Sequence, residues 1–244
     1  MPPPQAGAPT AAAAQQDDIQ LRQATLADLP AVAALYSLSF ADNPAYQWLF
    51  TGDVTVPAPE GALPWLFLRR ARMLLHRGNC LLVGCRGDEI VAAGGVVPFS
   101  NKPGTWDYFR NGIGLWPLWW GTASLKRALG MDAGLVKLLG SGLSVAGELS
   151  MVAVHPELQG RGLGGRVMQA LLEHWDAVHG GEGLLVMTQE AYALRLYAKF
   201  GFAPLDAAHP VSVHPQGGFH NWVMLRPGRQ ARGAAEGQAA GGRA

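Results

Sequence analysis

Residues 148–165 read Glu-Leu-Ser-Met-Val-Ala-Val-His-Pro-Glu-Leu-Gln-Gly-Arg-Gly-Leu-Gly-Gly. The β-branched and apolar residues of 148–154 predict a strand, and Pro156 ends it because proline cannot continue a hydrogen-bonded ladder. A helical apolar period begins near Leu163. Four glycines within six residues lie between strand and helix, so the N–H groups of this turn can converge on an anion. The stretch therefore predicts a strand, a pyrophosphate-binding turn and a helix.

The chain after this stretch predicts more sheet and helix. The helix is expected over 163–178, where glycines end it, and a buried strand follows over 184–188. A short helix is expected over 191–200, stopped by Gly201. The last expected elements are the two strands of a hairpin, 211–213 and 221–225.

The chain before the stretch begins with a predicted strand over 19–24. Thr25 and Asp28 offer a helix start, and a second amphipathic helix is expected over 63–77. That helix has a basic face, which we expect to be solvated. The residues of this face are Arg69, Arg70 and Arg72.

Two apolar runs, 80–85 and 90–97, flank a short polar turn and predict an antiparallel hairpin that precedes strand 148–154 in the same sheet. Residues 98–147 form an insertion with a helical stretch near 125–139. The insertion is rich in aromatic residues, which indicates either packing onto the core or the lid of an apolar pocket. These residues are Trp106, Tyr108, Phe109, Trp116, Trp119 and Trp120.

Length and composition predict one domain with two tails. The chain has 244 residues, of which 49% are hydrophobic, enough for one sizeable core. Residues 1–18 and 227–244 are expected to be disordered tails around a domain over 19–226. A net charge of +1 gives no electrostatic support for binding nucleic acid or an anionic membrane. The most apolar window, 113–125, is shorter than the roughly 20 residues that span a bilayer, so a soluble cytoplasmic protein is expected.

Other ligand sites are less compatible with the pattern. Gly160, Gly162 and Gly165 satisfy G-x-G-x-x-G, but five residues separate the strand from the first glycine and hairpins flank the motif, unlike a dinucleotide-binding βα series. No Gly-Lys-Ser/Thr follows, which excludes a P-loop. The histidines lack carboxylate or cysteine partners at ligand spacing, so no metal site is expected.

The stretch resembles motif A of the GNAT superfamily of acetyl-CoA-dependent N-acetyltransferases, Q/R-x-x-G-x-G/A after a strand that ends in V-x-P. Val154-His155-Pro156 matches the strand end, and the run from Gln159 to Gly164 matches the motif. Downstream, residues 193–202 read Ala-Leu-Arg-Leu-Tyr-Ala-Lys-Phe-Gly-Phe and resemble a second signature of the family, A-x-x-L-Y-x-K-x-G-F.

This resemblance covers residues 19–225 in the order of elements. It implies an α/β (α+β) protein with the GNAT fold, a mixed, mostly antiparallel sheet of six to seven strands flanked by helices. The helical, aromatic insertion 98–147 then precedes the fourth strand. Within the superfamily, the opening and closing segments look most like the puromycin-acetyltransferase-like branch.

The resemblance also implies how the coenzyme is held. The turn 159–165 and the start of the next helix receive the coenzyme A pyrophosphate, and the Val152 N–H polarises the thioester carbonyl. Glu190 departs from the family, since many members have asparagine seven residues before the motif tyrosine. The residues implied at the acetyl-CoA site are Val152, Ala153, Val154, Gln159, Gly160, Arg161, Gly162, Leu163, Gly164, Gly165 and Glu190.

Amide formation needs a base and an acid, because an ammonium has no lone pair and a free amine with a pKa of about 10 is scarce near pH 7. Strand alternation places Glu148 on one face with Ser150 and Val152. Glu148 resembles the general base of histone-acetyltransferase members, with Ser150 placed to orient a water. Tyr197 matches a family tyrosine proposed as general acid. Each residue also has a purely structural alternative. Glu148 could be a charged residue at the start of a strand, Ser150 a hydroxyl with its hydrogen bonds satisfied, and Tyr197 an aromatic residue of the core.

These expectations describe an N-acetyltransferase that moves acetyl from acetyl-CoA to a primary amine of a small molecule by direct attack, with Glu148 as base and Tyr197 as acid. Three alternatives stay open: a protein N-terminal or lysine acetyltransferase, a catalytically inactive CoA-binding regulator, and a nicotinamide-dependent oxidoreductase. A homodimer is also left open. Neither a nucleic acid nor a membrane partner is expected.

Overall fold

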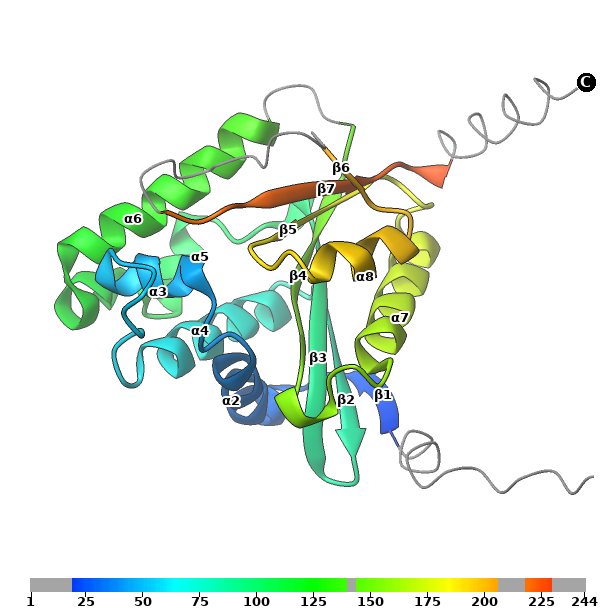
Figure 1. Cartoon of the computed structure of the whole chain (residues 1–244), viewed down its shortest axis with the longest axis horizontal. Helices are drawn as coiled ribbons and strands as arrows, with labels where there is room; N and C mark the ends of the chain where they lie inside the picture. The colour runs from blue at the N-terminus through cyan, green and yellow to red at the C-terminus, as the bar shows by residue number, and fades with distance from the viewer. Residues whose placement is uncertain (1–18, 140–143, 206–217, 230–244) are drawn as a thin grey trace, which may run out of the picture.

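The structure, a computed structural model, describes residues 19–139, 144–205 and 218–229, with the backbone alone for 132–139. A central sheet lies between helices on its two faces (Figure 1). The expected strand 211–213 and the expected tails, apart from 227–229, lie outside the described residues.

The first helix begins where its capping residues predict. Strand β1 (Ile19–Gln23) leads through a 3-10 turn, η1 (Leu26–Asp28), into α2 (Leu29–Ser39). The Thr25 N–H and Oγ1 donate to Asp28 Oδ2 at 2.7 and 2.8 Å, forming a capping box. Arg22 donates to both oxygens of the same carboxylate at 2.7 Å and holds the pKa of Asp28 well below its usual range. The predicted helix start is confirmed.

Two helices follow, α3 (Pro44–Thr51) and α4 (Ala62–His76). The solvated basic face expected on α4 is correct for Arg72, which is exposed, and wrong for Arg69 and Arg70, which are half-buried. Arg69 stacks its guanidinium over the Trp65 ring, 4.2 Å from the centroid, because a planar cation covers an aromatic face well.

The next strands, β2 (Cys80–Arg86) and β3 (Glu89–Pro98), form the expected antiparallel hairpin. The insertion then consists of helical pieces whose long helix begins nine residues before the predicted 125 and bends at Gly121, where φ is 77°. These pieces are η2 (Phe99–Asn101), α5 (Thr105–Arg110), η3 (Ile113–Leu115) and α6 (Trp116–Leu139).

The opening stretch forms the predicted strand, turn and helix. The helix α7 and the strand after it have the bounds that the sequence predicts. Among the described residues, the last strand pairs with two others. The elements are β4 (Gly147–Val154), η4 (Pro156–Leu158), α7 (Leu163–Val178), β5 (Leu184–Thr188), α8 (Ala193–Lys199), β6 (Ala203–Pro204) and β7 (Trp222–Arg226).

The seven described strands form one sheet in the order β1-β2-β3-β4-β5-β7-β6. Every described pair is antiparallel except β4 with β5. This parallel pair is short, because it joins Gly147 to Leu184 and Glu148 to Leu185 and then ends. Beyond Glu148 the two strands part, which leaves the sheet open in its middle.

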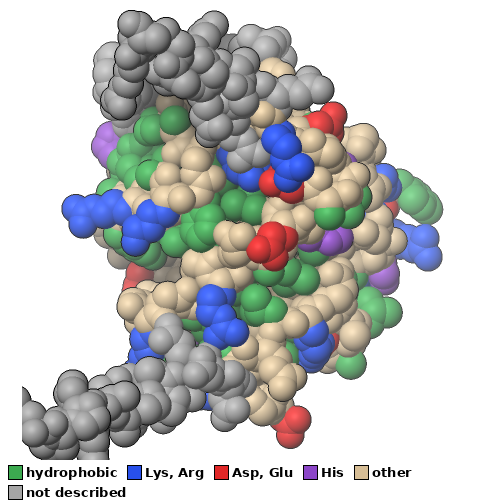
Figure 2. All heavy atoms as spheres, turned by 90° about the vertical axis from the view of Figure 1, so that its right-hand side faces the viewer, with side chains coloured by type: hydrophobic (Ala, Val, Ile, Leu, Met, Phe, Trp, Pro, Cys, Tyr) green, Lys and Arg blue, Asp and Glu red, His purple; other side chains and the backbone are tan. Residues whose placement is uncertain are grey.

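Two hydrophobic cores flank the sheet. Helices α2 and α4 pack on one face around the fully buried Tyr36 and Phe67. Helix α7 packs on the other face around Trp175 and Met168, which are also fully buried. On the outer surface beside α7 and α8, basic, acidic and apolar side chains are interspersed (Figure 2).

A buried ion pair joins α7 to β7. Both Nη atoms of Arg226 donate to the two carboxylate oxygens of Asp176 at 2.9 Å, and the Arg226 side chain is 7% exposed. This two-point contact fixes the second half of the sheet to the helix that follows the glycine turn.

We predict that Gly147→Ala destabilises the fold by about 1–3 kcal/mol through overpacking. A Cβ at this position would come 2.7 Å from the Val97 carbonyl oxygen and closer still to the Trp175 ring. Urea unfolding measures the change. The control is Gly104→Ala, where a new Cβ has its nearest neighbour at 3.9 Å. Equal free energies of unfolding for the two variants would contradict the prediction.

Candidate active site

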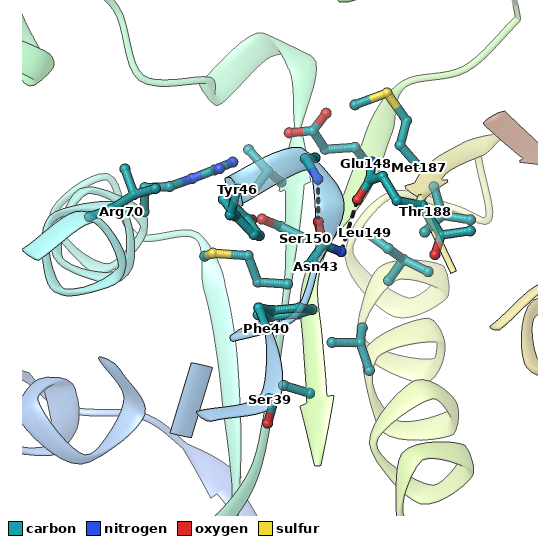
Figure 3. Close-up of a pocket in the computed structure, with 18 of the residues that line it drawn as sticks. Ser39, Phe40, Asn43, Tyr46, Arg70, Glu148, Leu149, Ser150, Met187 and Thr188 are labelled. Carbon is teal, nitrogen blue, oxygen red and sulfur yellow. Dashed lines mark hydrogen bonds between the residues drawn. The ribbon is translucent and has the colours of Figure 1, made fainter. Parts of the chain in front are cut away.

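A cavity of about 1060 Å³ lies where β4 and β5 part. Strand β4 lines it along its length, from Glu148 to Val154. The glycine turn and α8 line one part of the cavity, while α2, α3, α4 and the insertion line another. Figure 3 shows this second part, where side chains from α3, α4 and β4 surround a common space.

Strand β4 carries a β-bulge in the middle of this cavity. Its pairing with β3 passes from Ser150 opposite Gly95 to Ala153 opposite Ala93, so β4 has one residue more than β3 over this span. Met151 has a φ of 52°, which is uncommon for a residue other than glycine. A bulge leaves backbone groups outside the ladder and re-aims the side chains beside it.

The bulge also changes which face each side chain takes. Leu149 and Val152 both pack in the core beneath α7, whereas Met151 packs in the core beneath α2. Strict alternation is therefore broken between these residues. The expectation that Val152 shares a face with Glu148 and Ser150 is wrong for this physical reason.

The turn before α7 depends on its glycines. Gly160 has a φ of 75° and Gly162 has a φ of 84°, values that residues other than glycine rarely adopt. Gly162 precedes the first turn of a 16-residue helix, where the leading N–H groups have no helical partner. Such a terminus favours a negatively charged ligand.

Most residues implied at the coenzyme site lie together on the cavity wall. Arg161 and Leu163 do not line it, since Arg161 is exposed and the Leu163 side chain is 1% exposed in the core beneath α7. The implied residues that line the cavity are Val152, Ala153, Val154, Gln159, Gly160, Gly162, Gly164, Gly165 and Glu190.

The end of β4 is fixed by side chains. Gln159 Nε2 and Ser39 Oγ each donate to the Val154 carbonyl oxygen at 3.1 Å. The glutamine of the glycine turn thus holds the turn to the end of the strand. Ser39 adds a contact from α2 that the sequence alone did not indicate.

Glu148 forms an ion pair inside the cavity wall. Its Oε2 lies 3.0 Å from Lys102 Nζ, and the two side chains are 17% and 29% exposed. Lys102 comes from the insertion and also lies over the Phe99 ring, 4.8 Å from the centroid. Ser150 is buried and lines the same cavity. Figure 3 shows Glu148, Ser150 and Asn43 among the side chains that line the cavity.

Tyr197 reaches the cavity wall from α8. It is 7% exposed and packs edge-on against Phe202, with ring centroids 6.0 Å apart. Burial, with a smaller contribution from the nearby Tyr192, raises the pKa of Tyr197 to about 12. Its hydroxyl therefore stays protonated through the neutral range.

Three amides link α3 to the far side of the open sheet. Asn43 caps α3 through its Oδ1, which accepts from the Ala45 N–H at 3.0 Å, and its Nδ2 donates to Gln189 Oε1 at 3.2 Å. Gln189 Nε2 donates in turn to Asn221 Oδ1. No pattern in the sequence predicted these linked hydrogen bonds. Asn43 before Pro44 signals a helix start, but no local pattern signals the contact across the gap.

The aromatic insertion has two roles. Trp116 stacks on Phe50 with ring centroids 5.3 Å apart, and its Nε1 donates to Ser124 Oγ at 3.0 Å, so it packs the insertion onto the core. Trp116 also lines the cavity, together with Tyr108 and Phe109. The insertion therefore packs onto the core and also lines the cavity, although Trp106, Phe109 and Trp119 are mostly exposed.

The described residues include neither a metal-binding cluster nor a helix that could span a membrane. No group of three or more His, Cys, Asp or Glu side chains there is arranged to hold a metal ion. No helix within the described ranges has the length and apolar character needed to cross a bilayer.

Comparison with known proteins agrees with this geometry. Residues 121–204 match the family model of the acetyltransferase (GNAT) domain. The search of curated proteins found no significant match. Solved structures match most of the chain. Because their sequence identities are low, these matches show a shared fold and nothing more.

Three of these structures illustrate the likeness. A histone acetyltransferase HPA2 and related acetyltransferase from Corynebacterium glutamicum has a TM-score of 0.53 and 20% identity over 86% of this chain and 97% of that one. The putative acetyltransferase yncA from Salmonella typhimurium, solved with acetyl-CoA, has a TM-score of 0.52 and 18% identity, over 85% of this chain and 92% of that one. A polyamine N-acetyltransferase from Drosophila melanogaster has a TM-score of 0.52 and 18% identity, over 85% of this chain and 99% of that one.

The family match includes the glycine turn, and the solved acetyltransferases share the overall fold of this chain. Residues 121–204 thus match a GNAT acetyltransferase domain, and the chain has the GNAT fold.

Proposed function

We propose that this protein transfers an acetyl group from acetyl-CoA to the primary amine of a small molecule by direct attack. One observation carries the proposal: a single cavity is lined by the glycine turn, by the bulged strand β4, and by the side chains of Glu148 and Tyr197. An anion-binding turn, a carboxylate and a phenol then share the space in which donor and acceptor would meet.

The residues fit coenzyme A at the turn. Gly160 and Gly162 have positive φ values, and their amides stand beside the N-terminus of α7, as pyrophosphate binding needs. A Cβ on Gly160 would have nothing within 4 Å, so the space over this part of the turn is open. The coenzyme supplies the activated acetyl thioester. The chain would hold it by backbone groups of β4 and of this turn.

Strand β4 would also stabilise charge during transfer. Its ladder with β5 ends at Glu148, so the edge of 149–154 that faces the gap has no strand partner among the described residues. In the proposed mechanism, the Val152 N–H donates to the carbonyl oxygen of the bound acetyl group as negative charge develops there. Only the backbone of Val152 takes part, because its side chain packs in the core.

Glu148 and Tyr197 would move the two protons. The amine nitrogen forms a bond to the acetyl carbon while the carbon–sulfur bond breaks. Glu148 takes the proton that the amine loses, directly or through a water oriented by Ser150, and Tyr197 gives a proton to the departing sulfur. A phenol with a pKa of about 12 is protonated at neutral pH and is thus in the form that can donate.

The structural relatives suggest two kinds of acceptor, one a small molecule and the other a protein. The structural relatives include an agmatine N-acetyltransferase and a polyamine N-acetyltransferase, which suggests polycationic amines. Protein N-termini or lysines form the second class, which a relative described as a ribosomal-protein-alanine N-acetyltransferase suggests. A small-molecule acceptor is favoured over a protein because aromatic residues of the insertion, Tyr108, Phe109 and Trp116, contribute to the wall of the cavity.

We predict that Gly162→Ala raises the KM for acetyl-CoA about tenfold, because a Cβ at φ 84° strains the turn and moves its amides. Steady-state release of the free thiol measures this. Gly201→Ala is the matched control, since Gly201 has a φ of 80° and open space around it but does not line the cavity. An equal rise of KM in both variants would show that strain alone, rather than the coenzyme site, is responsible.

We predict that Glu148→Gln lowers kcat about 100-fold, and that Tyr197→Phe lowers it at least tenfold, because each removes one proton transfer. Rates are measured from pH 6 to 9 with saturating acetyl-CoA. Glu157→Gln is the control, because Glu157 is exposed beside the same turn and outside the cavity. Full kcat in both variants across this pH range would contradict the assignment of Glu148 as base and Tyr197 as acid.

A further inference from the structure

We propose that the acceptor is a monoamine with an apolar or aromatic body, and that Lys102 excludes polyamines from the cavity. This inference rests on the proposed acetyl transfer and concerns the part of the cavity that holds the acceptor. Lys102 would act as a specificity-determining residue through its ion pair with Glu148.

The walls of this part of the cavity are mainly apolar. Tyr46 packs between Phe40, at 5.8 Å between ring centroids, and Phe67, at 5.0 Å, so the aromatic wall is held firmly. An aromatic or aliphatic body would lose contact with water on such walls, whereas a chain with several charges would lose its hydration there without replacement. The wall residues used in this argument are Phe40, Tyr46, Met73, Tyr108, Trp116 and Met151.

Charge in the cavity favours a single ammonium. Among the described residues that line it, Glu148 is the carboxylate near the aromatic wall, while Glu190 lies beside α8. Lys102 Nζ lies 3.0 Å from Glu148 Oε2, whereas the other carboxylate oxygen, Oε1, has no hydrogen-bond partner among the described residues. One ammonium can therefore contact Oε1. A second ammonium would meet Lys102 instead of an acid.

Arg70 adds a second positive charge to the same wall. Figure 3 shows its side chain extending from α4 toward Tyr46. Burial raises the pKa of Tyr46, and the charge of Arg70 opposes this effect, which agrees with a guanidinium close to the ring. Two cations and one carboxylate thus surround the acceptor space, and like charges disfavour a polycation.

Lys102 is held in place from two sides. Glu148 binds its ammonium, and the Phe99 ring lies 4.8 Å from Nζ. Both Phe99 and Lys102 belong to the insertion, which therefore sets the charge of the cavity as well as its shape. Removal of the Lys102 charge would leave the whole Glu148 carboxylate to the amines of the substrate.

The test compares phenethylamine with spermidine in the full-length protein and in Lys102→Met. We expect wild type to prefer phenethylamine in kcat/KM, and Lys102→Met to shift the ratio toward spermidine about tenfold through loss of like-charge repulsion. Lys126→Met is the control, because Lys126 lies in the same insertion, is exposed and does not line the cavity. It should leave the ratio unchanged.

A wild-type preference for spermidine, or a ratio that Lys102→Met does not move, would overturn the inference. Thermal shift with each amine gives a readout without turnover. Stabilisation by phenethylamine but not by spermidine, with no thiol release, would contradict the proposed acetyl transfer and support the charge-based selectivity. Thiol release with a preference for spermidine would support the proposed acetyl transfer and contradict the charge-based selectivity.

Discussion

The parting of β4 from β5 is the constraint on which the rest of the site depends. The two strands are held together at Gly147 and Glu148 and then separate, so a row of backbone groups in the middle of the sheet has no strand partner in the part of the chain that the structure describes. Unpaired backbone groups in a protein interior are costly unless something binds them. A ligand that lies along β4 satisfies this requirement, and the glycine turn at the end of the strand provides the place for its phosphates.

Several contacts keep the gap open in one geometry. Gly147 allows Trp175 to approach the point where the strands separate, and the Asp176–Arg226 pair fixes α7 to β7 beyond it. On the other side, the chain from Asn43 through Gln189 to Asn221 joins α3 to the far strands. The gap is therefore bounded by rigid elements, as a site that positions two reactants needs.

Local signals predicted much of this fold. The capping residues Thr25 and Asp28, the hairpin turn after β2, and the glycines around α7 act through neighbours in the chain, so their effects can be read from short segments. The bulge at Met151 could not be predicted, because it depends on the register between β3 and β4, and it reversed the expected face of Val152. Lys102 was missed for a similar reason, since its contact with Glu148 joins residues 46 positions apart. The prediction that the basic face of α4 is solvated was wrong for two arginines, because a charged side chain can cover an aromatic ring or line a cavity as well as face water.

Amide hydrogen exchange with and without acetyl-CoA tests the central claim most directly. If the coenzyme lies along the open edge of β4 and binds the glycine turn, exchange should slow in peptides that cover 149–154 and 159–165. Peptides from β1 and the outer part of β2, on the far edge of the sheet, should not change. Protection confined to other segments, or coenzyme binding that leaves both β4 and the turn unprotected, would contradict the account.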